Sequence, residues 1–174
     1  GAEAPIHVLQ VNTDLDPKTG RVIIGTGGGL MYYDPIADSW KKEPERDSNS
    51  PASVGALDSD NRVFVQVMAS DAAISFYEID KPSVRQKAPI KGESGWGKRP
   101  GLAFHPSSKR MVIWDGGREV WSFSTSDWLV RKFTNPNGRA PFPLLANGYP
   151  KSAGVYGRWQ YVPDHDVFIA YNNA

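Results

Sequence analysis

Four short runs of the sequence read alike: Arg21-Val22-Ile23-Ile24, Arg62-Val63-Phe64-Val65, Arg110-Met111-Val112-Ile113 and Asp166-Val167-Phe168-Ile169. Their first residues are 41, 48 and 56 positions apart. β-Branched and aromatic residues dominate the runs, and Gly, Pro, Asp and Ser bound them, which is typical of β-strands between turns. Helical repeats of similar length are disfavoured by the same composition. The spacing therefore predicts an internal repeat whose unit is a small β-sheet.

Further strand candidates flank each run and are separated from it by polar turns. Four strands in a repeat of this length match a β-propeller blade. We therefore expect an all-β fold, a β-propeller segment of four-stranded antiparallel blades, with about three and a half blades in one domain over residues 1–174. The blades are expected at approximately residues 6–44, 52–89 and 101–133, with a half blade at 157–174. The first strand of the first blade is expected at residues 6–11.

Residues 27–40 combine three glycines, an aromatic pair followed by Asp34 and Pro35, and Trp40. This segment resembles the kelch motif, in which a glycine pair, an aromatic before Asp-Pro and a later tryptophan mark each blade. The third repeat keeps part of the pattern in Gly116-Gly117 and Trp128, whereas the second repeat lacks the glycines. The chain thus resembles the kelch-like propellers of the galactose-oxidase type, with degenerate repeats.

The resemblance implies a scaffold that recognises proteins or carbohydrates, because most known kelch propellers act in this way and a minority are enzymes. The copper-radical oxidase of this type requires a Cys–Tyr crosslink, and the sequence contains no cysteine. No cofactor is therefore expected. The lack of cysteine also excludes disulfides, thiol nucleophiles and cysteine zinc sites.

The charge balance argues against a nucleic-acid partner. The chain has 20 Lys+Arg and 19 Asp+Glu, which gives a formal net charge of +1, and its cations form no dominant stripe. No apolar run approaches the ~20 residues that cross a bilayer, so no membrane span is expected. The sequence leaves the compartment open, with a periplasmic or secreted location slightly favoured.

Three and a half blades do not close a propeller ring, because every blade needs a neighbour on both faces. The sequence therefore predicts that the remaining blades come from the same, longer polypeptide or from another chain. A homo-oligomer is one such arrangement, since two copies would supply seven blades.

The strongest functional signal lies in the loops between blades. Residues 90–100 place Trp96 among glycines and cations, and residues 134–156 form a long connection rich in Pro, Gly and Asn. Such loops are often functional, and aromatic faces beside cations suit sugars or peptides. The leading hypothesis is a non-catalytic recognition or scaffold module that binds glycan or protein through its rim loops. The expected ligand-binding residues are Trp96, Arg99, Arg118, Arg158 and Trp159; the alternative, that these aromatics pin the loops to the propeller, has equal weight.

Two other functions stay open. A carbohydrate-active hydrolase or lyase needs positioned carboxylates, and Asp71 and Asp115, in the loops between second and third strands, are the residues it would use. Ordinary turn roles are favoured for both. A structural subunit would instead use exposed blade faces for self-assembly.

Oxygen ligands alternate at Asn12, Asp14 and Asp16, as they do in calcium loops. Pro17 stands where such a loop has glycine, so a hairpin turn is favoured and no metal is expected. His105 and His165 occupy equivalent turns and are expected to be surface residues. No Gly-x-Ser-x-Gly occurs, so the sequence gives no sign of Ser-His-Asp catalysis.

Overall fold

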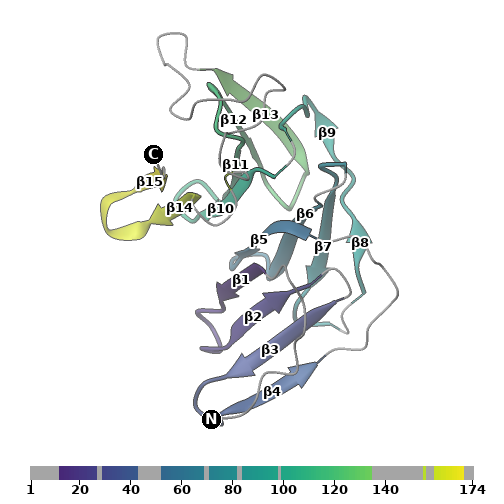
Figure 1. Ribbon diagram of the computed structural model, residues 1–174, viewed down its shortest axis with the longest axis vertical. Helices are drawn as coiled ribbons and strands as arrows, with labels where there is room; N and C mark the ends of the chain where they lie inside the picture. The colour runs from purple at the N-terminus through teal and green to yellow at the C-terminus, as the bar shows by residue number, and fades with distance from the viewer. Residues whose placement is uncertain are drawn as a thin grey trace.

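The computed structural model describes residues 12–26, 29–42, 52–68, 71–81, 84–97, 99–134, 155 and 159–170. These residues form sheets in which consecutive strands are antiparallel neighbours, with one short parallel strand added at the edge of the third sheet (Figure 1). Blade 1 contains β1 (Asn12–Leu15), β2 (Val22–Gly25), β3 (Leu30–Asp34) and β4 (Ser39–Lys42). Blade 2 contains β5 (Ala52–Asp58), β6 (Val63–Met68), β7 (Ile74–Glu78) and β8 (Gln86–Lys87). Blade 3 contains β10 (Gly101–His105), β11 (Arg110–Trp114), β12 (Glu119–Phe123) and β13 (Leu129–Thr134). Half blade 4 contains β14 (Trp159–Val162) and β15 (Val167–Ala170), joined by the 3-10 turn η2 (Pro163–His165).

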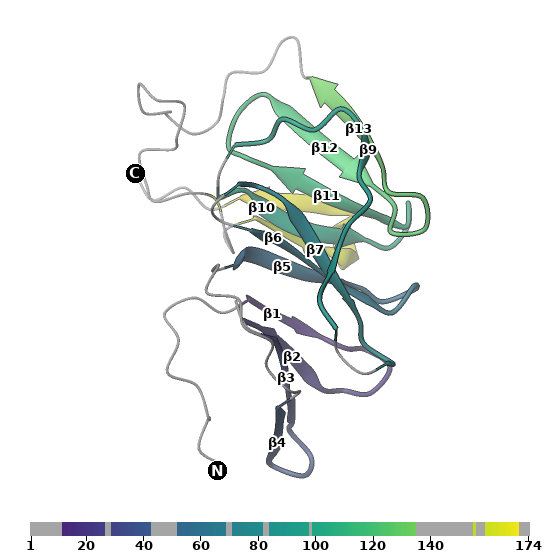
Figure 2. The same cartoon turned by 90° about the vertical axis from the view of Figure 1, so that its right-hand side faces the viewer.

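The first strands of the four sheets form one row. Strand β5 contacts both β1 and β10, and β10 contacts β14. Figures 1 and 2 show the sheets fanning outward from this row, as the blades of a propeller do. The predicted fold class is confirmed: the described residues form an all-β propeller segment of three four-stranded blades and a two-stranded half blade.

The four repeated runs are the second strands of their sheets, as the alternation predicts. The first strand of blade 1 differs from the prediction. It lies at Asn12–Leu15, in register with β2 from Asn12↔Gly25 to Leu15↔Val22, while residues 6–11 lie outside the described residues. The turn starts later than expected because the Asp16 amide donates to the Arg21 carbonyl at 2.8 Å and closes the hairpin there.

One strand was not predicted. Strand β9 (Lys91–Gly92) pairs in parallel with β13, the outer strand of blade 3. The Lys91 amide donates to the Trp128 carbonyl at 3.0 Å, and Gly92 adopts a left-handed φ of 84° that glycine tolerates without strain. A two-residue strand leaves no periodicity in the sequence, so only the tertiary contact reveals it.

The largest core cluster lies between blades 2 and 3. Trp128 has a left-handed φ of 57°, and its ring stacks on Phe123 of its own blade and packs against Phe76 of blade 2, with centroids 5.7 and 4.8 Å apart. Trp121 is fully buried in the same cluster. Trp40, by contrast, is half buried and packs on Tyr33 within blade 1. The aromatics of the middle repeats therefore hold neighbouring blades together.

Candidate functional site

Antiparallel blades divide the loops between two rims. The turns between first and second strands and between third and fourth strands lie on one side, which we call the hairpin rim. The loops between second and third strands and the connections between blades lie on the other, which we call the connector rim. Figure 2 shows the hairpin turns of β1–β2, β5–β6 and β10–β11 on its right-hand side.

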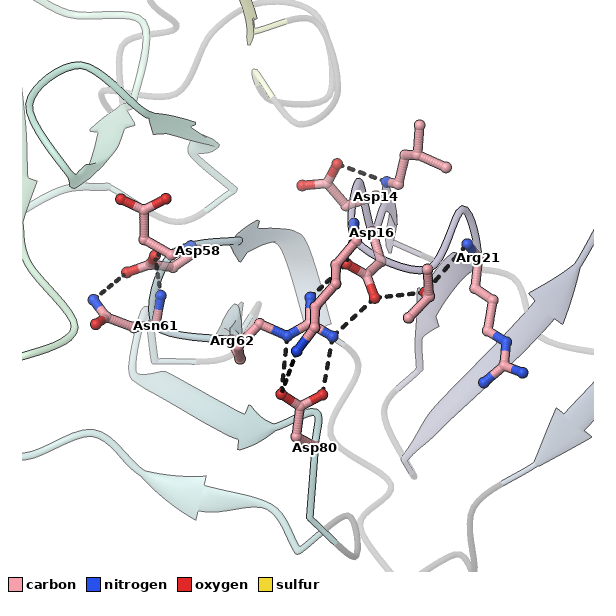
Figure 3. Close-up of polar contacts among 11 residues, drawn as sticks. Asp14, Asp16, Arg21, Asp58, Asn61, Arg62 and Asp80 are labelled. Carbon is pink, nitrogen blue, oxygen red and sulfur yellow. Dashed lines mark hydrogen bonds and ion pairs between the residues drawn. The ribbon is translucent and has the colours of Figure 1, made fainter.

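An ionic cluster joins blades 1 and 2 on the hairpin rim. The Arg62 guanidinium lies between Asp16 of blade 1 and Asp80 of its own blade (Figure 3). Arg62 Nη2 is 2.9 Å from an oxygen of each carboxylate. The Asp16 side chain is only 4% exposed. Hydrogen bonding to Arg62 is the main cause that lowers the pKa of Asp16 to about 2, so this buried carboxylate stays charged.

The three oxygen-bearing residues proposed for a metal do not share one site. The two Asp16 oxygens bond Arg62, Thr19 and the Lys18 amide. Asp14 accepts the amide of Leu57 in blade 2 at 2.8 Å, and burial raises the pKa of Asp14. Asn12 is buried at the opposite end of β1. Within the described part of the chain, no three His, Asp or Glu side chains come together as metal ligands.

A second polar contact joins blades 2 and 3 on the same rim. Asp58 is fully buried and accepts the Thr125 hydroxyl of blade 3 at 2.6 Å. Asn61 donates to both Asp58 and Thr125 at 3.0 Å. Asp58 and Asn61 belong to the polar turn between the first two strands of blade 2, and this turn also holds the adjacent blade.

His105 provides the corresponding contact between blade 3 and half blade 4. It is the last residue of β10, and its Nε2 lies 2.7 Å from Asp166 Oδ1 of the half blade. His105 is partly exposed at the end of β10, beside the turn where it was expected, and its ring also reaches the next sheet. His165 is exposed within η2, as expected.

Trp96, the central residue of the predicted binding loop, lies on the connector rim with only 7% of its surface exposed. Its Nε1 donates to the Ala72 carbonyl at 3.0 Å, and its ring meets Trp121 edge to face with centroids 6.1 Å apart. Trp96 thereby fixes the loop before β10 to the β6–β7 loop of blade 2. Most of its ring packs in the core, and a small part lines a pocket.

That pocket, of about 550 Å³, opens between the β6–β7 loop and the segment that follows β8. Small and apolar side chains form its walls, and polar groups stand among them; the lining residues are Asp71, Ala72, Ala73, Ile74, Lys87, Ala88, Pro89, Ile90, Ser94, Gly95 and Trp96. Asp71 and Lys87 are exposed and bring opposite charges to the pocket. The pocket thus combines apolar side chains with one acidic and one basic side chain.

Asp115 binds two loops of the connector rim. Its Oδ2 accepts the Gly97 amide and its Oδ1 accepts the Gly117 amide, each at 3.0 Å. Asp71 similarly accepts the Ala73 amide at 3.0 Å. Both carboxylates considered for catalysis therefore accept backbone amides and organise loops of the connector rim.

The remaining predicted ligand residues are dispersed. Arg118 is exposed in the β11–β12 loop, and Arg99 is exposed with its carbonyl accepting the Val155 amide at 3.1 Å. Trp159 is half buried and packs between Trp114 and Phe168, with centroids 4.9 and 4.8 Å away. Arg158 lies outside the described residues. Of the four predicted residues that the structure describes, Trp96 alone lines the pocket.

Comparisons with known proteins identify a fold and no family. No family model matches the sequence, and no curated protein matches it. Among solved structures, virginiamycin B lyase from Staphylococcus aureus is similar at a TM-score of 0.56 and 15% identity over 78% of this chain and 45% of the lyase. A chain of a nidogen/laminin complex is similar at a TM-score of 0.56 and 14% identity over 74% of this chain and 49% of that chain.

These similarities show a β-propeller fold. They do not assign the chain to the kelch-like type that the glycine and tryptophan pattern indicated. The chain spans about half the length of the solved propellers it matches. Among the described residues, no helix is long and apolar enough to cross a bilayer.

Proposed function

We propose that this chain is part of a recognition module, which binds a polypeptide segment in the connector-rim pocket without catalysing a reaction on it. The pocket of about 550 Å³ between Asp71 and Trp96 carries this proposal. Its walls of Ala73, Ile74 and Ile90 suit an apolar side chain, and Asp71 and Lys87 can meet polar groups on either side of it. The nidogen/laminin complex provides an example of a propeller-like fold in a protein assembly.

The burial of the Trp96 ring favours a peptide over a glycan as the ligand. A sugar platform requires an open aromatic face, and the Trp96 ring is buried with its indole nitrogen already bonded to Ala72. A hydrolase or lyase is not favoured, since Asp71 and Asp115 each accept backbone amides at separate loops. The kelch-like assignment stays a hypothesis that rests on residues 27–40.

Filling the pocket tests this proposal without removing a core residue. Peptides selected from a displayed random library against the purified chain would serve as probes, with a glycan array screened in parallel. We expect Ala73→Trp to weaken peptide binding at least tenfold by calorimetry, because the indole occupies the space of the ligand side chain. The matched variant Ala37→Trp, at an exposed turn of the hairpin rim, should bind as the unmodified chain does.

Three results would contradict the proposal: selection of no peptide, equal binding by Ala73→Trp, or enrichment of glycans alone. Both tryptophan variants need thermal midpoints within a few degrees of the parent, so that loss of binding is not loss of fold. Trp96→Ala is a poorer test, since Trp96 also belongs to the core between blades 2 and 3.

We further infer that additional blades complete the ring. Phe133 of blade 3 is 56% exposed and Ile169 of half blade 4 is 53% exposed. In the described chain β15 pairs only with β14, whereas the second strands of blades 1 to 3 each have two partners. The rest of a longer polypeptide would supply the missing strands, and residues 1–174 would then be one part of a domain.

Light scattering distinguishes the sources of those blades. If the missing strands belong to the same polypeptide, the isolated chain should show the mass of one copy, 19.2 kDa, together with binding of a dye for exposed apolar surface. The substitution Phe133→Ser should reduce dye binding. A stable dimer of unmodified chains that binds no dye would show instead that a second copy covers these faces.

A further inference from the structure

His105 lies between a hydroxyl and a carboxylate on the hairpin rim. Its Nδ1 is 2.6 Å from Ser108 Oγ, and its Nε2 is 2.7 Å from Asp166 Oδ1. The Tyr161 hydroxyl donates to the same Asp166 oxygen at 2.8 Å. The order of groups is therefore serine, histidine, carboxylate, which is the arrangement of a nucleophile, a base and a group that orients the base.

The backbone presents these groups from two sheets. Ser108 lies in the tight turn after β10, which the Lys109 amide closes by donating to the Pro106 carbonyl at 3.1 Å. Asp166 follows η2 in a left-handed conformation with a φ of 51°. The two segments are neighbours because β10 packs beside β14.

The imidazole ring is held by aromatic neighbours. Tyr161 meets it edge to face with centroids 5.0 Å apart, and Phe168 packs at 5.5 Å. The His105 side chain is 21% exposed, so the base is packed on its flanks and still open to solvent. Such packing fixes the direction of both ring nitrogens, which is the preorganisation that general-base catalysis requires.

The Asp166 carboxylate determines the direction of the hydrogen bonds that His105 makes. Hydrogen bonds from His105 and Tyr161 lower the pKa of Asp166, so its carboxylate is charged and can only accept. Nε2 of the ring therefore carries the hydrogen that faces Asp166. In the neutral ring Nδ1 then has a free lone pair, and Ser108 Oγ donates its proton to that nitrogen.

We propose that Ser108 is an activated nucleophile toward acyl and phosphonyl electrophiles, with His105 as its base and Asp166 as a positioning residue. Ser108 Oγ would bond to the carbonyl carbon of an ester while its proton moves to His105 Nδ1. The leaving alkoxide would take that proton and depart as the alcohol. Water would then hydrolyse the acyl-serine, which releases the acid and restores the hydroxyl.

The turn also limits the rate of this reaction. The amide of Lys109, the residue that follows Ser108, is already bonded to the Pro106 carbonyl and is not available as an oxyanion donor. The loss of one oxyanion donor costs about 10²–10³ in rate in hydrolases that have one. Slow, stoichiometric modification is therefore expected rather than rapid turnover, and a phosphonate label that forms a stable adduct is the suitable probe.

The test is to incubate the purified chain with an alkyl fluorophosphonate and to map the adduct by mass spectrometry. The expected result is one adduct per chain, on Ser108, with fluoride released. Ser126→Ala removes another exposed hydroxyl on the hairpin rim of blade 3 and should be labelled at the parent rate. Ser108→Ala should not be labelled. Asp166→Asn should slow labelling at least tenfold, and Asp166→Glu should restore part of the rate.

Several outcomes would overturn the proposal. One is the absence of a Ser108 adduct after an incubation about 10³ times longer than a serine hydrolase needs for complete labelling. Another is indiscriminate labelling of Ser107 and Ser108. A third is a parent-like rate in Asp166→Asn, which would leave His105 and Asp166 as a purely structural contact between blades. Circular dichroism of each variant should match the parent, and because labelling of the unmodified chain is decisive by itself, a variant that fails to fold does not remove the test.

Discussion

Replacing Arg62 with methionine is expected to lower the free energy of unfolding by about 3 kcal/mol, because the change leaves the Asp16 carboxylate charged and unpaired between blades 1 and 2. The Arg62 side chain is 16% exposed and Asp16 only 4%, so solvent screens this contact far less than a surface ion pair. Methionine keeps most of the aliphatic packing of arginine. The loss in the free energy of unfolding therefore measures the effect of removing the guanidinium charge. Urea unfolding followed by tryptophan fluorescence measures it.

Arg21→Met is the matched control. Arg21 immediately precedes the second strand of blade 1, as Arg62 precedes that of blade 2, and it pairs with Asp34 at 3.2 Å. Both partners are more exposed than Asp16, and exposed pairs contribute about 0–1 kcal/mol. Equal losses in the two variants would show that the Arg62 contact has no special role between blades.

The Arg62 effect should depend on pH. Because the folded-state pKa of Asp16 is lowered from 3.8 to about 2, its stabilisation is fully present above pH 4 or so and is lost as the pH falls through about 2. The difference between the parent and Arg62→Met should therefore shrink across that window. A difference that stays constant from pH 7 to pH 2 would exclude Asp16 as the partner that matters.

Trp121→Ala is expected to cost about 4 kcal/mol, the range for truncating a buried tryptophan. Trp121 is 1% exposed, within the cluster between blades 2 and 3, and its ring supports Trp96 edge to face. The cavity left by alanine would also loosen the loop that Trp96 fixes to Ala72. Thermal and urea unfolding measure the loss.

Trp121→Phe separates packing from hydrogen bonding. The Trp121 indole nitrogen has no partner among the described residues, so phenylalanine removes area without breaking a bond and should cost about 1–2 kcal/mol. If phenylalanine were as destabilising as alanine, the indole nitrogen would have to hold a contact that the structure does not show.

Local patterns predict the strands of this fold well and the contacts between blades poorly. Alternating apolar residues and turn chemistry placed the second strands at the four repeated runs, because both signals are local. The position of β1 was missed because Asn12–Leu15 is polar for a strand and its pairing with β2 defines it. Strand β9 was missed for the same reason, since only β13 makes it a strand.

In the candidate sites too, local signals were predicted from the sequence and contacts between distant segments were not. The sequence indicated that Trp96 and its loop are important, and the structure places Trp96 partly in the core and partly at the pocket. It could not show that Ala73 and Lys87 share that pocket, because Ala73 lies in the β6–β7 loop and Lys87 in β8. The contact of His105 with Asp166 was missed, although Asp166 stands where the other three repeats have arginine. This aspartate at the arginine position of the repeat was the sequence signal that could have indicated the contact with His105.

The contacts on the hairpin rim also specify the order of the blades. Between blades 1 and 2 the earlier blade carries the acid, Asp16, and the later one the base, Arg62. Between blade 3 and half blade 4 the earlier blade carries His105 and the later one the acid, Asp166. If half blade 4 docked on blade 1, Asp166 would meet Asp16 and two carboxylates would face each other. Repeated units can misassemble with the wrong neighbour during folding, and the acid at Asp166, where blade 2 has Arg62, gives half blade 4 a reason to reject blade 1.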